Sequence, residues 1–329
     1  MHKVLIGALS FNDLPFLRES MPMLEQLRQS LPADVAVMDT AGNDEIRDFF
    51  KKEYPHFHYM RHPEGNIGYG RAHSELLRAF PGYKYYLAHT SDVLMEPATV
   101  KEFVQRMEKD ETLSMVAGKL YHWDFKENLR TRNIDSLGIE AEKRHHFYDR
   151  GHGEEDRGQY DEILNDVFGI SGAVFLIRTQ VIPKLHGHAW ELFDRRMWMY
   201  KEDIDLSYRL RWLGEKIHIF PEVWGWHART VSNSGGQGVK SLAKAQKDKR
   251  DYARIHSYKN HFLLLKNNFS WRYGLPTLLK TIFFEILKAG FMLLRHPSVF
   301  FAGFKTLLFV PGRSSDRRVS AAEVLSYFK

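Results

Sequence analysis

The stretch YYLAHTSD at residues 85–92 predicts a buried strand that ends in a carboxylate. A short apolar run that stops at polar residues is typical of a strand covered on both faces of a sheet. Mg²⁺ and Mn²⁺ prefer oxygen ligands and usually take only one or two of them from protein carboxylates. Asp92 is therefore a candidate ligand for a divalent cation, with a turn-capping aspartate as the simpler alternative.

Upstream of this strand, three apolar runs alternate with helical patterns. The predicted strands are 4–9, 35–38 and 57–60, and the predicted helices are 12–27, 45–53 and 70–80. This alternation predicts an α/β fold with a parallel, doubly wound sheet. Ligands bind such sheets beyond the carboxyl ends of the strands. One cleft is therefore expected to collect Ser10, Asp39, Asn66 and Asp92, which all follow predicted strands.

Two of these strand ends carry more than a single polar residue. Asp39, in the segment DTAGN, can accept hydrogen bonds from a base or a ribose, although plain turn chemistry explains it equally well. The segment NIGYGRAH at 66–73 opens a helix through two glycines, and backbone amides with Arg71 would suit a phosphate. No G-x-G-x-x-G follows the first strand, which argues against a nicotinamide enzyme.

The second half of the chain supplies candidates for proton transfer. Residues 122–168 are expected to be an irregular excursion over the cleft, followed by a helix at 199–213 and strands at 217–220 and 223–227. In the segment KEDID, Asp203 is a candidate general base, although acidic residues are favoured at helix starts in any case. Asp205 and Arg209 should form a surface ion pair. His227 could complete a metal site or be purely structural.

Basic charge is concentrated in the last quarter of the chain. Residues 240–329 hold 17 Lys and Arg against 5 Asp and Glu, whereas residues 1–239 hold 30 against 36. The Ser/Gly/Asn stretch 232–238 is the expected boundary, and helices are expected throughout 240–310. The apolar segment 275–294 is interrupted by charges, so it lacks the roughly 18 uncharged residues of a spanning helix.

The pattern in 275–294 predicts an amphipathic helix lying in a membrane interface. Its polar residues fall on one helical stripe and leave a wide apolar face with Lys and Arg beside it. A helical bundle or a homo-oligomer interface is the alternative. Nucleic acid is not expected as a partner, because the basic residues are interleaved with aliphatic ones. With no cysteine and no signal-peptide pattern, we expect a cytoplasmic protein on the inner face of the cell membrane.

The order of these signals resembles the family 2 glycosyltransferases with a GT-A fold. The resemblance covers about residues 3–235. The segments IDSLG (134–138), RGHG (150–153), SGA (171–173) and YKEDIDL (200–206) look like the bacterial rhamnosyltransferase branch. The resemblance implies a GT-A domain at 1–235, with a Rossmann-like, mostly parallel sheet and flanking helices. A basic, apolar helical region would follow at 236–329.

The resemblance also implies a reaction and a set of site residues. The chain would be an inverting transferase that uses Mg²⁺ or Mn²⁺ and moves a sugar, L-rhamnose from dTDP-rhamnose being favoured, to a glycan or lipid-linked acceptor. Asp92 and His227 would bind the metal, with Asp203 as the base and Glu202 beside it. The donor would contact Ser10, Asn12, Asp39, Asn66, Gly68, Arg71, Ser91 and Asp92. The acceptor side would include Ser171, Gly172 and Tyr200.

The sequence departs from the family pattern at two positions. Thr90 and Ser91 precede Asp92 where the family has acidic or amide residues, and His73 stands where it often has asparagine. Two other classes of protein compete with this interpretation. A nucleotidyltransferase would need a Gly-rich basic loop after the first strand, which SFND at 10–13 does not provide. A non-catalytic relative is disfavoured by the intact Asp92, Asp203 and His227.

Overall fold

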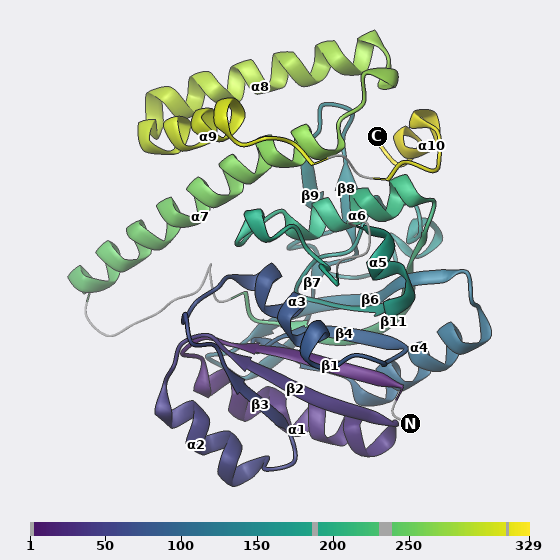
Figure 1. Cartoon of the computed structure of the whole chain (residues 1–329), viewed down its shortest axis with the longest axis vertical. Helices are drawn as coiled ribbons and strands as arrows, with labels where there is room; N and C mark the ends of the chain where they lie inside the picture. The colour runs from purple at the N-terminus through teal and green to yellow at the C-terminus, as the bar shows by residue number, and fades with distance from the viewer. Residues whose placement is uncertain (1–2, 186–189, 230–238, 314–315) are drawn as a thin grey trace.

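The centre of the molecule is a nine-stranded mixed sheet with helices on both faces (Figure 1). The computed structural model describes residues 3–185, 190–229, 239–313 and 316–329. The sheet order is β3-β2-β1-β4-β10-β6-β11-β5, with β7 paired to β6. The strands are β1 (Val4–Ser10), β2 (Ala33–Asp39), β3 (His58–Arg61), β4 (Tyr85–Thr90), β5 (Val93–Met95), β6 (Leu113–Asp124), β7 (Leu129–Ser136), β10 (Val174–Arg178) and β11 (Lys216–His227).

Most strands of the sheet run in one direction. Strands β3, β2, β1 and β4 pair in parallel. Because β10 is antiparallel to both β4 and β6, strand β6 and its parallel neighbour β11 point the same way as β4. The carboxyl ends of β1, β2, β4 and β11 therefore meet at one edge. This confirms the predicted α/β class with a mostly parallel sheet.

Helices from the first half of the chain cover the two faces. Helices α1 (Leu14–Ser30) and α4 (Pro97–Lys109) pack on each other, and α3 (Tyr69–Ala79) packs on β1 and β2. Figure 1 shows α1 and α2 (Asp44–Glu53) on one side of the sheet and α3 and α6 (Glu202–Leu213) on the other. These helices and their strands match the elements predicted for residues 4–90, with ends that differ by a few residues.

Two expectations for the second half of the chain are wrong. Residues 122–168 are not one irregular excursion, since they contain the end of β6, then β7, and the hairpin of β8 (Ile139–Ala141) and β9 (Phe147–Asp149). Strand β7 is polar because half of it is exposed. The strands expected at 217–220 and 223–227 are one strand, β11, which carries irregularities in its register between Ile219 and Gly225. Such bulges accommodate a proline, here Pro221, within a strand.

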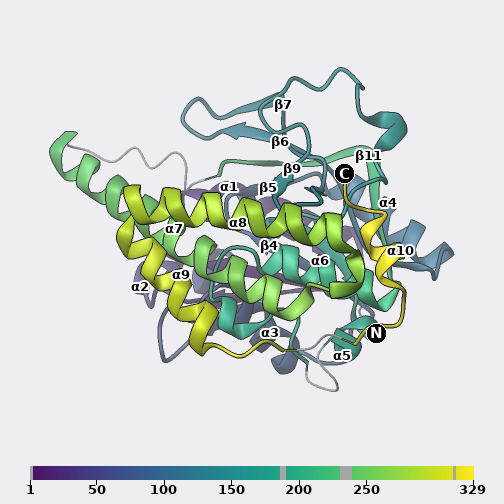
Figure 2. The same cartoon turned by 90° about the horizontal axis from the view of Figure 1, so that it is seen from above.

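The last quarter of the chain forms helices, as predicted. They are α7 (Val239–Asn268), α8 (Leu275–Arg295), α9 (Pro297–Phe309) and the short α10 (Ala321–Leu325). Helix α9 packs against both α7 and α8, and α7 contacts α6. Figures 1 and 2 show these helices stacked beyond α6, on the side of the molecule opposite α1. The boundary expected at 232–238 lies outside the described residues.

The C-terminal helices share a hydrophobic core with the sheet domain. Tyr208 and Trp212 of α6 pack in one cluster with Leu264 of α7 and Phe328 near the C-terminus. The indole nitrogen of Trp212 also donates a hydrogen bond to the carbonyl oxygen of Asn268 at 3.1 Å. The region after α6 is therefore packed into the rest of the chain through buried aromatic residues.

Helix α8 turns most of its polar side chains toward the protein and exposes many of its apolar side chains. Thr277 and Thr281 are buried, and Glu285 and Lys288 also turn inward, to His261 of α7 and to each other. The large apolar residues exposed on α8 are Leu275, Leu279, Ile282, Phe283, Ile286, Leu287, Phe291, Leu293 and Leu294. We call these nine residues the apolar face of α8. No helix within the described residues is long and apolar enough to cross a membrane.

Candidate active site

The carboxyl ends of β1 and β4 meet around a carboxylate that the sequence analysis did not select. The hydroxyl of Ser10 donates to Oδ1 of Asp13 at 2.7 Å, and the hydroxyl of Ser91 donates to Oδ2 of the same residue. Burial raises the pKa of Asp13, and the two serine hydroxyls oppose that shift. Asp13 thereby links two predicted donor-binding residues, Ser10 and Ser91. Asn12 beside it is exposed and has a left-handed backbone, φ 53°.

Asp39 at the end of β2 is fully buried and held by four donors. Tyr59 donates its hydroxyl at 2.6 Å and Arg61 its Nε at 3.3 Å, both to Oδ2. The amides of Ala41 and Gly42 donate to Oδ1 at 2.9 and 3.2 Å. This turn chemistry accounts for the carboxylate itself, so a nucleoside contact at Asp39 stays a prediction. Tyr59 and Arg61 come from β3 and had no signal of their own in the sequence.

The loop before α3 passes so close to a neighbouring segment that only glycine fits. Gly68 has φ 80°, and a Cβ atom there would lie 2.3 Å from the carbonyl oxygen of Trp198. Asn66 closes the turn by accepting from the Gly68 amide at 3.0 Å. Arg71 forms ion pairs with Glu64 and Glu75, both at 2.8 Å. Arg71, Asn66 and Trp198 line a cavity of about 640 Å³, and phosphate contacts of Arg71 remain a prediction.

Asp92 and His227, the predicted metal ligands, lie side by side after β4 and at the end of β11. Nε2 of His227 is 3.4 Å from Oδ2 of Asp92, and Nδ1 is 2.9 Å from Oδ2 of Asp135. Burial alone would lower the pKa of His227, but the two carboxylates outweigh it and raise that pKa to about 10. His227 is thus fixed between two carboxylates, with Nε2 directed at Asp92.

Asp135 is the fully buried partner that orients His227. Its Oδ1 accepts from Nε of Arg229, and Nη2 of Arg229 reaches Asp149 at 2.6 Å. Histidines that bind metals usually donate their second ring nitrogen to a carboxylate, which fixes the tautomer and the ring. Asp135 belongs to the IDSLG segment, which entered the sequence analysis only as a family likeness. Its contact with His227 spans 92 positions and could not be read from local spacing.

The donor set at Asp92 and His227 fits Mg²⁺ or Mn²⁺. One carboxylate and one imidazole leave most coordination positions open, as these ions require when they bind phosphate groups of a substrate. Within the described part of the chain, no three His, Asp or Glu side chains gather into a closed metal cage. An ion at this pair would therefore take its remaining ligands from the substrate and from water.

Asp203, the predicted base, lies in the first turn of α6. The amide of Gly172 donates to its Oδ2 at 2.9 Å, and the amide of Ile204 donates to its Oδ1 at 2.8 Å. Burial raises the pKa of Asp203, and the Gly172 hydrogen bond opposes that shift. Gly172 thus positions Asp203. Among the described residues, Ser171 has no comparable contact, and the acceptor roles of Ser171 and Gly172 stay predictions.

Tyr69 contacts the segment that holds Asp203, the predicted base, and is also influenced by the charge of Asp92, a predicted metal ligand. Its hydroxyl donates to the carbonyl oxygen of Gly172, next to Asp203. Burial raises the pKa of Tyr69 well above the usual value, and the carboxylates of Glu202, Asp203 and Asp92 raise it further. The charges of all three carboxylates therefore act on one phenol. Tyr69 had no signal of its own in the sequence, because the glycines and Arg71 of the 66–73 segment indicated a phosphate loop.

Glu202 beside the base is almost completely buried, with one unpaired oxygen. Its side chain is 7% exposed, and Oε2 has no hydrogen-bond partner among the described residues. Burial raises the pKa of Glu202 well above its usual range, and the charge of Asp203 adds to this. Burial thus favours the neutral form of Glu202, whereas Asp203 has two amide donors that favour its charged form.

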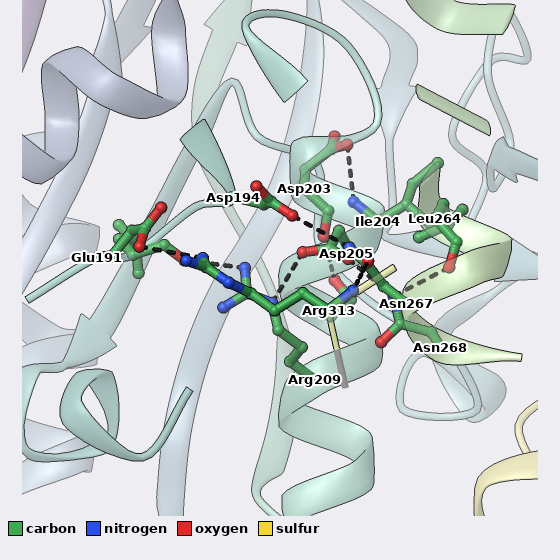
Figure 3. A network of polar contacts seen from close by, with 12 residues as sticks. Glu191, Asp194, Asp203, Ile204, Asp205, Arg209, Leu264, Asn267, Asn268 and Arg313 are labelled. Atoms are coloured by element: carbon green, nitrogen blue, oxygen red, sulfur yellow. Dashed lines mark hydrogen bonds and ion pairs between the residues drawn. The ribbon is translucent and has the colours of Figure 1, made fainter. Parts of the chain in front are cut away.

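The ion pair expected at Asp205 and Arg209 is present, but it is buried and not at the surface. Nε of Arg209 donates to Oδ2 of Asp205 at 2.8 Å, and Asp205 is fully buried. Nδ2 of Asn268 donates to Oδ1 at 2.7 Å, so a residue of α7 completes the site (Figure 3). Helical spacing predicted the pair. It could not reveal that α7 covers the pair, because α7 is distant in sequence.

A mostly parallel sheet with an Asp–His pair at its carboxyl edge and an acidic helix start across from it defines a GT-A glycosyltransferase. The profile of the family described as "Glycosyltransferase like family 2" matches residues 12–247. The chain therefore belongs to this family and is a glycosyltransferase. No curated protein matches the sequence significantly.

Solved structures of glycosyltransferases align with the chain at low sequence identity, and the first of them has the same fold. A mannosyltransferase from Pyrobaculum calidifontis, PcManGT, in complex with GDP-Man and Mn²⁺, aligns with TM-score 0.52 and 14% identity, covering 92% of this chain and 73% of that one. TarS from S. aureus aligns with TM-score 0.49 and 11% identity, covering 80% and 42%. TarS 1–349 in complex with UDP aligns with TM-score 0.46 and 11% identity, covering 80% and 70%.

Proposed function

We propose that the chain is an inverting, metal-dependent transferase that moves a sugar from a nucleotide-diphosphate donor to an acceptor hydroxyl. The observation that carries this proposal is the position of Gly172, whose amide donates to Asp203 at 2.9 Å and whose carbonyl oxygen accepts from Tyr69, just before the strand that pairs with β4. Asp92 follows β4, so this position supports a predicted base and a predicted metal ligand at one site. The Mn²⁺ and GDP-Man bound to the mannosyltransferase of the same fold are consistent with such a site.

The reaction is a single displacement. Asp203 takes the proton of the acceptor hydroxyl as its oxygen forms a bond to the anomeric carbon, and the bond to the diphosphate oxygen breaks on the opposite face. The bond-forming and bond-breaking steps on opposite faces invert the anomeric centre. A divalent cation held by Asp92 and His227 would neutralise the departing nucleoside diphosphate. Glu202, whose neutral form is favoured by burial, is suited to donate a hydrogen bond to the acceptor and not to compete for its proton.

Removal of the metal tests the cation assignment. Donor turnover should require Mg²⁺ or Mn²⁺ and should stop in excess chelator, then recover when the ion is restored. An Asp92→Asn variant should need a higher metal concentration, and Asp110→Asn, at an exposed site, serves as the control. Full activity of the wild-type chain in excess chelator would refute the proposed metal dependence.

The donor is proposed to be a deoxythymidine-diphosphate sugar, with L-rhamnose favoured. This assignment rests on the RGHG and YKEDIDL segments of the sequence. The structure adds that Gly151 and Gly153 both have positive φ, and that Arg150 is buried against Glu140 at 2.5 Å, so the first segment shapes the backbone. Calorimetry with thymidine, uridine and guanosine diphosphates tests it. Tight binding of uridine diphosphate with none of the thymidine nucleotide would contradict the proposal.

The acceptor is proposed to be a glycan or lipid-linked glycan at an anionic membrane surface. The apolar face of α8 supports this, because a helix that exposes a row of large apolar side chains needs an apolar partner. Lys280 and Arg295 are exposed on the same helix, which suits anionic lipids better than a protein core.

A further inference from the structure

The turn before the catalytic helix has a backbone conformation that side chains rarely adopt. Tyr200 and Lys201 have φ values of 69° and 68°, both in the left-handed region, and neither is glycine. Such conformations persist only where the surroundings hold them, and they cluster at functional sites. Asn260 of α7 holds this one, because its Nδ2 donates to the carbonyl oxygens of Met199 and Tyr200, both at 2.8 Å.

The held turn places a lysine without a counterion next to the base. The structure shows no hydrogen bond or ion pair for the Lys201 ammonium among the described residues, although Lys201 is only two residues from Asp203. Burial lowers the pKa of Lys201, while the charges of Asp203 and Glu285 oppose that shift. A half-buried lysine that has no direct partner is suited to bind an anion.

More cations gather beside Lys201, where the turn of the β8–β9 hairpin meets α8. Around the ring of Phe284, the guanidinium of Arg144 lies at 4.9 Å and the ammonium of Lys288 at 5.6 Å from the centroid. Lys288 lowers the pKa of His261, as does Lys201, which indicates that all three groups are neighbours. Glu285 contacts both His261, at 2.7 Å, and Lys288, at 3.7 Å.

Buried polar atoms at this junction lack partners. Among the residues that the structure describes, Nδ1 of His261 and the hydroxyl of Tyr258 have no hydrogen-bond partner, although these residues are only 1% and 3% exposed. Oε2 of Glu285 has no partner among these residues either. Buried groups are nearly always hydrogen-bonded in proteins, so several unpaired ones together indicate a place built for a ligand or for water.

We propose that Lys201 and Lys288, with Arg144, form a subsite for the phosphate or diphosphate group of a lipid-linked acceptor. This inference rests on the proposed function and names the acceptor class of the same site. The subsite lies between the base and the apolar face of α8. An acceptor whose hydroxyl reaches Asp203 would thus have its phosphate at the two lysines and its lipid chain along α8.

The diphosphate group of the sugar donor is the other candidate ligand for Lys201 and Lys288. It is expected beside Asp92 and His227, whereas Lys201 and Lys288 face Glu285 of α8. The experiment must separate these two sources. It must also separate a diphosphate subsite from the general attraction of basic proteins to anionic lipids, which does not depend on the headgroup.

The test compares the full-length chain on two kinds of vesicle. Phosphatidylcholine vesicles carry either a polyprenyl diphosphate or phosphatidylglycerol, at matched total charge, and binding is measured by co-sedimentation. The wild type should prefer the diphosphate vesicles. Lys201→Met and Lys288→Met should each reduce that preference about tenfold, the usual worth of one charge-assisted hydrogen bond. Lys280→Met, exposed on α8, should weaken binding to both vesicles equally.

Nucleotide binding provides the second measurement. Calorimetry with nucleoside diphosphate and Mg²⁺ should give the same affinity for Lys201→Met, Lys288→Met and the wild type, and it also shows that the variants are folded. The proposal is overturned if the wild type has no preference between the vesicles, if the lysine variants keep it, or if they lose nucleotide affinity. Failure of the subsite leaves nucleotide binding intact, whereas failure of the proposed function removes it.

Discussion

At the scale of single residues, the site depends on carboxylates with different environments. Asp203 accepts two amide hydrogen bonds, Glu202 beside it has an unpaired oxygen, and Asp135 is paired with His227 and Arg229. Environment decides which carboxylate acts as a base, which stays neutral and which positions another group. Two predictions follow from this division of roles.

Replacement of Asp203 by asparagine should remove the base without changing the shape of the site. Transfer should fall at least about 100-fold, because a positioned base typically contributes about 10²–10⁴-fold. Donor affinity, measured by calorimetry, should barely change, because the donor contacts lie elsewhere.

The matched control for Asp203 is Asp205, two positions further on. Asp205→Asn leaves the Arg209 guanidinium buried without its counterion, so the variant should lose about 3–5 kcal/mol of unfolding free energy. Its remaining folded fraction should still transfer sugar. A near wild-type transfer rate for Asp203→Asn would place the base elsewhere, with Glu202 as the next candidate.

Asp135→Asn should weaken metal binding through His227. The substitution removes the carboxylate that orients the imidazole, and losses of such partners usually cost about 10–100-fold in metal affinity. Titration of Mn²⁺ followed by electron paramagnetic resonance measures this directly, without an acceptor. Asp156→Asn, another buried carboxylate with a lysine partner, is the control for general damage. Equal Mn²⁺ affinity in the wild type and in Asp135→Asn would show that Asp135 has no such role.

At the scale of elements, sequence patterns were sufficient wherever a strand or helix carries its own signal. The strands and helices of residues 4–90 follow from apolar runs and helical periodicity alone. Strand β7 was missed because its exposed half is polar, and β11 was divided because Pro221 interrupts its pattern. Asp13, Tyr69 and Asp135 were missed for a related reason. Asp13 has one local contact, with Ser10, but the contacts with Ser91, Gly172 and His227 that bring the three residues to the site are distant in sequence, and spacing does not encode them.

The sequence predicted a polar stripe on α8. It did not predict which side of the helix faces the protein. The structure turns Thr281, Glu285 and Lys288 inward, so the apolar face is exposed. If this face lies on the membrane, Phe283→Glu combined with Leu287→Glu should weaken binding to anionic vesicles at least about 100-fold, because each buried side chain contributes about 1.5–3 kcal/mol.

The control for the α8 variant is Leu129→Glu, which changes an exposed leucine on β7. Its vesicle binding should equal that of the wild type. Unchanged vesicle binding of the double variant would rule out the membrane assignment. If the double variant instead converts a dimer to a monomer in sedimentation, the apolar face of α8 is a subunit interface.

At the scale of the whole molecule, the sheet domain and the C-terminal helices share buried contacts. Residues 1–235 include Tyr208 and Trp212, whose cluster is completed by Leu264 and Phe328. Asp205 likewise has Asn268 as a partner. The candidate donor residues all lie within residues 1–235. Removal of residues 240–329 would nevertheless expose the aromatic residues of this cluster and unpair buried polar groups.

A chain of residues 1–235 should therefore fail to unfold cooperatively. Calorimetry and circular dichroism should show a broad transition or aggregation, whereas the full chain gives one cooperative transition. Co-expression of 1–235 with 239–329 should restore it, which controls for a general defect of the shortened chain. A truncated chain that unfolds cooperatively and binds nucleotide would mean that the sheet domain is independent after all.

A single displacement at the anomeric carbon can be tested without knowing the acceptor. Water can replace the acceptor slowly, so the sugar first released from the donor reports the face of attack. Proton NMR with Mg²⁺ and a panel of nucleotide sugars, recorded before mutarotation, should show the inverted anomer, and Asp203→Asn should abolish it. Release of the anomer with retained configuration, or no turnover of any nucleotide sugar by the wild-type chain, would contradict the account.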